Sequence, residues 1–359
     1  MEEGSHLAGS NINVLLKEEL DGGDKKMGPE EDNLETESRK PMKNETSDKC
    51  FYMLPFSGQT RNKPLIYTFF SLIYLVGVLL NSSIITAICL DVQLHKPMYL
   101  FICNLSIVDI FYTSVTVPKL LHILLSGNHI VSFSQCYTQL YFYFTVATAE
   151  EILLFIMAYD RYVAICLPLH YHRILSRRNC ILITIGFWPV AFINSLVLLT
   201  TVLYMTSCHS NIIHQFFCDV KSLTKTTCTG TLMLFVIAGI EILVLGFIPL
   251  MCTFISYINI FSVIFKMKSK ESRKKAFSTC FSHIIVVCIY FGTCLIGYMI
   301  PPYSDILDLI FTIVYTTITP MMNPIIYSLQ NSNVQSALLK LMKLRYILKS
   351  RQELKQKVK

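Results

Sequence analysis

Charge is scarce in this sequence. Only 15% of its 359 residues are charged, against about 25% in soluble domains, whereas 53% are hydrophobic. The stretch from Ile130 to Tyr159, for example, has Glu150 and Glu151 as its only charged residues. With a mean hydropathy of +0.49, the chain is too apolar to be built around one soluble core. The composition therefore excludes a soluble globular protein and indicates a protein embedded in a membrane.

The sequence also lacks the motifs of common enzymes and of duplicated transporters. It contains no Gly-rich phosphate loop, no Gly-x-Ser-x-Gly sequence and no paired histidine ligands at helical spacing. We therefore expect no enzymatic activity. No internal repeat is visible, which argues against transporters built from two related halves.

Long apolar stretches make up most of the chain. Seven of them are each long enough to span a bilayer, and short polar connections separate them, apart from one long link over residues 205–230. We predict an all-α membrane protein in which residues 64–330 form a bundle of seven transmembrane helices. The stretches run approximately over residues 65–90, 98–121, 134–166, 179–204, 231–265, 276–300 and 306–329.

The positions of the basic residues predict the orientation of the bundle. One set of connections and the C-terminal segment carry most of the basic residues, whereas the opposite connections hold only Lys119, Lys221 and Lys225. Basic connections stay on the cytoplasmic side, so we expect the N-terminus outside and the C-terminus inside. The net charge of +7 then belongs to the inner face, where it would meet anionic lipids and a protein partner rather than nucleic acid. The basic residues of this face are Lys96, Arg161, Arg173, Arg177, Arg178, Lys266, Lys268, Lys270, Arg273, Lys274, Lys275 and eight from Lys340 onward.

The two ends of the chain differ from the bundle. Residues 1–63 are acidic, poor in apolar residues and without the apolar region of a signal peptide, so we predict a disordered extracellular tail. The sequence Asn44-Glu45-Thr46 is an acceptor for N-glycosylation on that side. Residues 331–359 alternate apolar and basic side chains, as in Val334, Leu338 and Lys340, which predicts a short amphipathic cytoplasmic helix followed by a basic tail.

An ion pair closes the third apolar stretch. The tripeptide Asp160-Arg161-Tyr162 lies at its end, and a charge pair there is costly unless it sits at the water boundary or serves a switch. Cys136 precedes Arg161 by 25 residues, or about 37 Å of helix, which exceeds the hydrocarbon thickness of about 30 Å. We therefore expect Cys136 at one membrane face and Arg161 at the other.

Four longer motifs carry a resemblance to a known family. They are residues 96–109 (KPMYLFICNLSIVD), 157–171 (MAYDRYVAICLPLHY), 275–283 (KAFSTCFSH) and 320–327 (PMMNPIIY). In this order they resemble class A (rhodopsin-like) G-protein-coupled receptors and, among these, vertebrate odorant receptors of the class II type. The resemblance extends over residues 44–331.

The resemblance implies a function and a location. It implies a receptor in the plasma membrane of olfactory cilia that binds small odorants in the outer half of the bundle. Binding would activate a stimulatory heterotrimeric G protein and raise cyclic AMP, with no cofactor other than a possible sodium ion. Three departures from the family pattern support an alternative. They are Leu80 before Asn81, Gln330 and Ser332 at the end of the seventh stretch, and the long N-terminal segment. In that alternative the chain is a non-signalling or decayed copy that acts, if at all, at the membrane surface.

Several residues form the expected switch. In the resting state Asp160 would neutralise Arg161, and the freed guanidinium would then meet the G protein together with Tyr162. The alternative is a simple ion pair at the membrane interface. Proline removes a backbone hydrogen bond and bends a helix, and each bend is either part of the switch or only a tolerated kink. The expected pairs of proline and tyrosine are Pro249 with Tyr257 and Pro324 with Tyr327, the latter preceded by Asn323.

Two acids fall in the middle of membrane helices. Asp109 and Glu150 resemble the receptor positions that line a central pocket for a sodium ion together with Asn323, and Ser106, one turn from Asp109, could join them. A proton could replace the cation, and the alternative is a hydrogen-bonded network without an ion. Glu151 points elsewhere on the helix and has no assigned role.

Thirteen cysteines are present, and topology separates them. Four fall on the outer, oxidising side and allow three connectivities. The resemblance implies Cys136–Cys218, which ties the long link to the third helix, and Cys208–Cys228 within the link. The alternative is a metal site from His209, His214 and Cys218, and we expect no firm metal site.

The resemblance places the ligand among the outer halves of helices three, five, six and seven, under the long link. Such a cavity would be mostly apolar with a few hydroxyls and one acid, which suits a small volatile or weakly polar molecule. For each lining residue the alternative is ordinary helix packing. The candidates are Tyr143, Phe144, Ala147, Thr148, Ala238, Glu241, Leu245, Phe291, Cys294, Leu295, Tyr298, Ile313 and Thr316.

Glu241 is the only charged residue between Thr229 and Phe265. It precedes Pro249 by eight residues, or about 12 Å along the helix, which is the depth of the expected pocket. We expect it to face Thr148 and Tyr143, or the ligand itself. The ionised carboxylate would bind an amine or another strong donor, the protonated acid would donate to a carbonyl, and the alternative is a structural hydrogen bond between helices.

Overall fold

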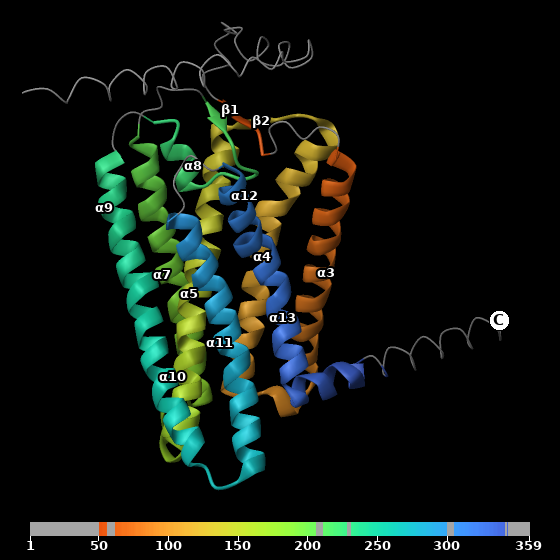
Figure 1. Ribbon diagram of the computed structural model, residues 1–359, viewed down its shortest axis with the longest axis vertical. Helices are drawn as coiled ribbons and strands as arrows, with labels where there is room; N and C mark the ends of the chain where they lie inside the picture. Colours follow the sequence, from red (N-terminus) through yellow and green to blue (C-terminus); the bar gives the residue numbers. More distant parts are fainter. Residues whose placement is uncertain are drawn as a thin grey trace, which may run out of the picture. The chain divides into compact units, whose positions relative to one another are not determined.

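The computed structural model describes residues 50–55, 62–205, 211–227, 231–299, 305–341 and 343 (Figure 1). This part of the chain contains seven helices that are long and apolar enough to cross a membrane, so the predicted seven-helix bundle is confirmed. The spans begin and end within several residues of the predicted apolar stretches. The first four spanning helices are α3 (Lys63–Leu90), α4 (Pro97–Ser126), α5 (Phe133–Cys166) and α7 (Arg177–Leu203).

A π-helical turn interrupts the fifth and the seventh span. The fifth consists of α9 (Thr231–Glu241), the turn Ile242–Phe247 and α10 (Ile248–Lys266), and the sixth is α11 (Lys270–Met299). The seventh consists of α12 (Asp305–Ile313), the turn Val314–Ile318 and α13 (Thr319–Gln330). A π turn widens the helix and rotates the residues that follow, so the faces of these two spans depart from regular 3.6-residue spacing.

Side-chain caps fix where several helices begin. At the start of α5 the Ser132 hydroxyl accepts from the Gln135 amide while the Gln135 side chain accepts from the Ser132 amide, which forms a capping box. Ser176 caps α7 through the amide of Asn179. At its end α4 stops at Gly127, whose φ of 68° lies in the left-handed region that glycine adopts without strain.

A small sheet covers one end of the bundle, which we call the sheet end. Its strands are β1 (Cys50–Met53), β2 (Ile130–Ser132) and β3 (Ile212–Ile213), in the order β2-β1-β3. The central β1 pairs antiparallel with β2, with Phe51 opposite Val131, and parallel with β3, with Tyr52 opposite Ile212. Residues 50–53, which lie inside the segment predicted to be an extracellular tail, therefore form a strand. The remainder of that segment up to Lys49, including Asn44, is outside the described residues.

The bundle buries polar side chains within an apolar core and also exposes apolar side chains on its outer surface. In α4 and α5 61% of the most apolar window is buried, against 6% in the fifth span, so α4 and α5 form the centre. Large apolar side chains such as Leu65 and Leu232 are exposed on the outer surface, where lipid would cover them. Buried Asn81 donates from Nδ2 to the carbonyl oxygens of Gly77 and Pro320, both at 3.1 Å, and thereby joins α3 to α13.

A last helix spans residues 332–341 and leaves the end of α13 at a steep angle (Figure 1). Its buried side chains are Val334 and Ala337, whereas Leu339 and Lys340 are exposed. Lys340 Nζ lies 2.9 Å from the Oδ2 atom of Asp91, which holds the helix against the connection between α3 and α4. The hydrogen bond from Lys340 lowers the pKa of Asp91.

Candidate functional site: a cavity, a polar network and an ion pair in the bundle

A cavity of about 650 Å³ lies inside the bundle. It is bounded by α5, the fifth span and α11, with single residues from α4, α7 and the seventh span. Val220, from the short helix α8 (Val220–Thr224) in the long link, also lines it. Figure 1 shows α8 beside the upper ends of α7 and α9, so the link approaches the cavity from the sheet end. The volume is typical of a site for a small molecule.

Most of the residues predicted to contact a ligand line this cavity, and three do not. Leu245, Ile313 and Thr316 are absent from its described lining, and the side chain of Tyr298 lies outside the described residues. Leu245 lies in the π turn of the fifth span, where Ile242, Gly246 and Leu250 follow Ala238 at intervals of four residues along the cavity. The predicted residues that do line the cavity are Tyr143, Phe144, Ala147, Thr148, Ala238, Glu241, Phe291, Cys294 and Leu295.

Thr316 contacts its own helix instead of the cavity. It lies in the π turn of the seventh span, and its buried Oγ1 donates to the carbonyl oxygen of Thr312 at 2.7 Å. Tyr315, one position earlier, lines the cavity in its place. A π turn contains one residue more than an α-helical turn. Positions predicted from regular α-helical spacing are therefore displaced by one residue.

Glu151, for which no role was predicted, also lines the cavity. It follows the buried Glu150 directly, so the two carboxylates point to different sides of α5. The signal that could have identified it is simple, because an acid within a membrane span rarely faces lipid and so has to face the interior. Tyr112 and Tyr290 are further lining residues that the sequence did not single out.

Asn194 connects Thr148 and Glu241. Its Nδ2 atom donates to Thr148 Oγ1 at 3.0 Å and to Glu241 Oε1 at 2.7 Å. The expected direct contact of Glu241 with helix three is therefore replaced by a bridge through the amide of α7. Oε1 of the Glu241 carboxylate accepts this hydrogen bond, and Glu241 also lines the cavity.

A second polar cluster lies deeper in the bundle. Asn323 Nδ2 donates to Asp109 Oδ1 at 2.9 Å and reaches Glu150 Oε1 at 3.5 Å, and all three side chains are buried. Ser106 is buried one turn before Asp109. Among the described residues, Asp109 Oδ2, Glu150 Oε2 and Asn323 Oδ1 have no hydrogen-bond partner. Unpartnered oxygen atoms of this kind fit a hard monovalent cation or protons.

The Asp160–Arg161 pair closes α5 at the end opposite the sheet. Arg161 donates to Asp160 Oδ2 at 2.5 Å, and the Tyr171 hydroxyl donates to Asp160 Oδ1 at 2.9 Å. Tyr171 begins the short helix α6 (Tyr171–Ile174), and sequence reasoning did not identify its contact. Burial, together with the Asp160 charge, raises the pKa of Tyr171, so the phenol remains a donor.

The remaining predicted switch residues lie on the facing helices. Tyr162, on α5 itself, is half-buried against the apolar cluster that contains Tyr257 of α10. The hydroxyl of Tyr257 lies 2.6 Å from His283 Nδ1 of α11. Pro249 opens α10 directly after the π turn, and Pro324 lies inside α13. Tyr327 is buried, and its hydroxyl has no hydrogen-bond partner within the described chain. His283 was not predicted to belong to this group.

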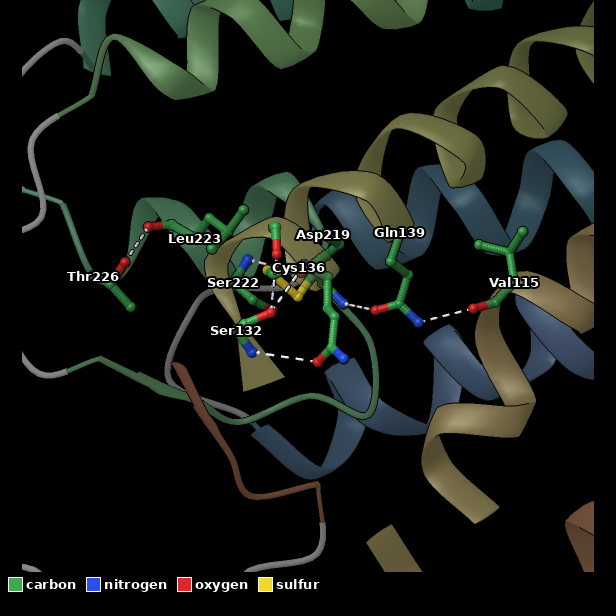
Figure 2. Close-up of a disulfide and its surroundings, with 11 residues drawn as sticks. Val115, Ser132, Cys136, Gln139, Asp219, Ser222, Leu223 and Thr226 are labelled. Carbon is green, nitrogen blue, oxygen red and sulfur yellow. Dashed lines mark hydrogen bonds between the residues drawn. A yellow bond between two sulfur atoms is a disulfide. The ribbon is translucent and has the colours of Figure 1, made fainter. Parts of the chain in front are cut away.

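A disulfide between Cys136 and Cys218 ties the long link to α5, the pairing that the family resemblance implies. Gln139 supports it, because its Oε1 accepts from the Cys218 amide at 3.0 Å and its Nε2 donates to the Val115 carbonyl at 2.8 Å (Figure 2). Cys218 is therefore not available for a metal site with His209 and His214. Cys208, Cys228 and His209 lie outside the described residues.

Comparison with known proteins places the chain among receptors of one kind. Residues 70–345 match the olfactory receptor family. The chain is 41% identical to olfactory receptor 1G1 of Gorilla gorilla gorilla over 311 aligned residues. The alignment covers 85% of this chain and 98% of the relative. It is 40% identical over 305 residues to olfactory receptor 1f45 of Rattus norvegicus, and this alignment covers 84% of this chain and 97% of the relative. It is 39% identical over 303 residues to human olfactory receptor 1A1, and this alignment covers 83% of this chain and 96% of the relative.

These relatives are receptors and not enzymes, so the chain has no enzymatic function. The family match begins within the first span, at Phe70, and covers the other six spans completely. The chain therefore belongs to the olfactory receptor family, a group of G-protein-coupled, multi-pass membrane receptors.

Proposed function

We propose that this chain is an odorant receptor that binds a small molecule in the 650 Å³ cavity and activates a stimulatory heterotrimeric G protein, raising cyclic AMP. The observation that carries the proposal is the cavity itself, which lies under the disulfide-tied link in a chain of the olfactory receptor family. Ligand contact at Phe291, in the last third of α11, would move that helix relative to the Asp160–Arg161 pair.

The basic residues support one orientation in the membrane. Arg161, Arg173 and Arg273 lie at the end opposite the sheet, so we place this end and the helix over residues 332–341 in the cytoplasm. The sheet end, and the segment with Asn44 as a glycosylation site, would then face outward. In this orientation the receptor resides in the plasma membrane of olfactory cilia, and its basic inner end contacts anionic lipids and the G protein.

The test is an odorant screen. Cells that contain the receptor and an olfactory-type stimulatory G protein should raise cyclic AMP in response to some members of a broad odorant panel, and cells without the receptor should not. Surface staining of an N-terminal tag on unpermeabilised cells measures both delivery and orientation. A receptor that reaches the surface but answers no odorant would instead support a non-signalling copy.

We further propose that the cluster of Asp109, Glu150 and Asn323 holds a sodium ion, with its three unpartnered oxygen atoms as the expected ligands. The ion would neutralise part of the buried charge, and Ser106 could complete the shell. A ligand that binds only the folded state stabilises it by about 2.7 kcal/mol at 100 times its Kd.

Sodium should therefore raise the melting temperature of the purified receptor relative to choline at equal ionic strength. Asp109→Asn keeps an oxygen acceptor for Asn323 but removes the charge, so this variant should lose the difference between the two salts. Equal melting temperatures of the unaltered receptor in sodium and in choline would favour the ion-free hydrogen-bonded network.

A further inference from the structure

The cavity is lined by acids and aromatic rings and by no base. Its described lining contains two carboxylates, Glu151 and Glu241, and no lysine, arginine or histidine. The remaining residues are apolar or carry hydroxyl and thiol groups. An anionic ligand would be repelled by both acids. The lining therefore has the charge pattern of a site for a cation.

The two carboxylates approach the same region of the cavity. Glu151 lies one helical turn after Thr148 on α5, and Thr148 is joined to Glu241 through the amide of Asn194. Asn194 and Thr148 thus form a hydrogen-bonded path from Glu241 to the turn of α5 that carries Glu151. Glu241 lies on the fifth span, so the pair faces the cavity from two different helices.

The acceptor capacity of these two acids is largely unused. Asn194 provides Glu241 with one hydrogen bond, and within the described chain no side chain or amide donates to Glu151. Removing an ionised carboxylate from water costs several kcal/mol unless a partner replaces the lost hydrogen bonds. An ammonium group has several N–H donors and a positive charge, so it can satisfy both carboxylates at once.

Aromatic rings line the same cavity as the carboxylates. A cation over the face of an aromatic ring gains further attraction, and the same rings provide apolar surface for a hydrocarbon chain. Tyr112 and Tyr143 pack edge to face with ring centroids 5.5 Å apart, and Tyr290 and Phe291 do so at 5.3 Å. The aromatic lining consists of Tyr112, Tyr143, Phe144, Phe247, Tyr290, Phe291 and Tyr315.

We propose that the cavity selects small organic amines in their protonated form, with the ammonium group between Glu151 and Glu241 and the hydrocarbon part against the aromatic rings. This proposal rests on the proposed function of the chain as an odorant receptor. A neutral carbonyl ligand would use a protonated acid as donor, and it would leave the second carboxylate without a partner.

A series of ligands with one hydrocarbon skeleton tests the selection. Hexylamine, hexanol, hexanal and hexanoic acid are compared by cyclic AMP response in cells with and without the receptor. Hexylamine should be active at concentrations at least about tenfold lower than hexanol, since charge-assisted hydrogen bonds are roughly twice as strong as neutral ones. A receptor that answers hexanol or hexanal but not hexylamine would leave the odorant receptor proposal intact and overturn the amine proposal.

Two variants assign the selectivity to the carboxylates. Glu151→Gln and Glu241→Gln keep the side-chain size and the apolar cavity, so each should raise the half-maximal concentration of hexylamine by about tenfold or more. The response to hexanol should change far less. Glu271→Gln removes an exposed carboxylate from the first turn of α11, outside the cavity, and should leave the order of ligands unchanged.

A binding measurement separates the two proposals if no member of the series raises cyclic AMP. Hexylamine should raise the melting temperature of the purified receptor more than hexanol does, and Glu151→Gln should reduce this shift. An amine-specific shift without signalling would count against the proposed function and support the cavity assignment. Equal shifts for hexylamine and hexanol, or an amine shift that both glutamine variants retain, would overturn the amine proposal.

Discussion

Replacing Cys218 with serine should remove most of the receptor from the cell surface. The disulfide to Cys136 closes a loop with a sequence separation of 82 residues, and losing a native disulfide typically costs about 2–5 kcal/mol. Without it, the link loses its covalent connection to α5, and the buried Phe217, whose ring centroid lies 4.7 Å from that of the cavity-lining Tyr143, loses its anchor. Surface staining of a tagged receptor, divided by its total amount in the cell, measures the loss.

A matched control uses a cysteine without a partner. Cys288 is free and exposed on α11, so Cys288→Ser makes the same chemical change where no disulfide is lost. This variant should reach the surface normally, whereas Cys136→Ser should behave like Cys218→Ser. Normal surface delivery and odorant response of Cys218→Ser would show that the hydrogen bonds of Gln139 hold the link without the disulfide.

The seven helices could be predicted from the sequence because a membrane places a strict demand on the chain. Each span needs about 20 predominantly apolar residues, and a polar residue within such a stretch is rare enough to be noticed. Asp109 and Glu150 were singled out on this ground and Asn323 through the family resemblance, and the structure brings the three into one buried cluster. The seven spans and the buried polar cluster were therefore predicted mainly from the long apolar stretches and from the few charged residues within them.

Contacts that depend on local geometry were not predictable in the same way. The π turns at Ile242–Phe247 and Val314–Ile318 shift the helix faces, which is why Leu245 and Thr316 were placed on the cavity by regular spacing but lie outside its lining. An asparagine in an apolar helix such as Asn194 indicates a buried partner but not which one. Its bridge between Thr148 and Glu241 follows only from how α5, α7 and the fifth span pack together.

The sheet at the end of the bundle shows a further limit. Strand β1 has only four residues, and it lies beyond the acidic segment that gave the N-terminal region its composition. It is paired on both sides with strands that are distant in sequence, β2 and β3. Because a short strand is stabilised by its partners and not by its own residues, its presence could not be inferred before those partners were placed.

Replacing Arg161 with alanine should abolish odorant-evoked cyclic AMP while leaving the receptor at the surface. In the structure this guanidinium is held by Asp160, whose second oxygen is in turn bonded by Tyr171. If the freed guanidinium binds the G protein, alanine cannot replace it, because alanine lacks the planar set of hydrogen-bond donors. Cyclic AMP is measured with an odorant that activates the unaltered receptor, at matched surface level. A normal response of Arg161→Ala would remove the ion pair from the switch.

The same arrangement predicts the opposite effect when the restraint is weakened. Asp160→Asn removes the charge that holds Arg161, and Tyr171→Phe removes one of the two donors to Asp160, so both should raise cyclic AMP without any odorant. Hydrogen bonds to charged groups contribute about 1.5–3 kcal/mol, enough to shift a two-state equilibrium by about tenfold or more. Tyr159→Phe is the control, because Tyr159 is exposed one position before the motif and should leave the odorant-free signal unchanged. If Asp160→Asn instead leaves the odorant-free signal at the level of Tyr159→Phe, the pair is a structural contact at the membrane boundary and does not restrain the resting state.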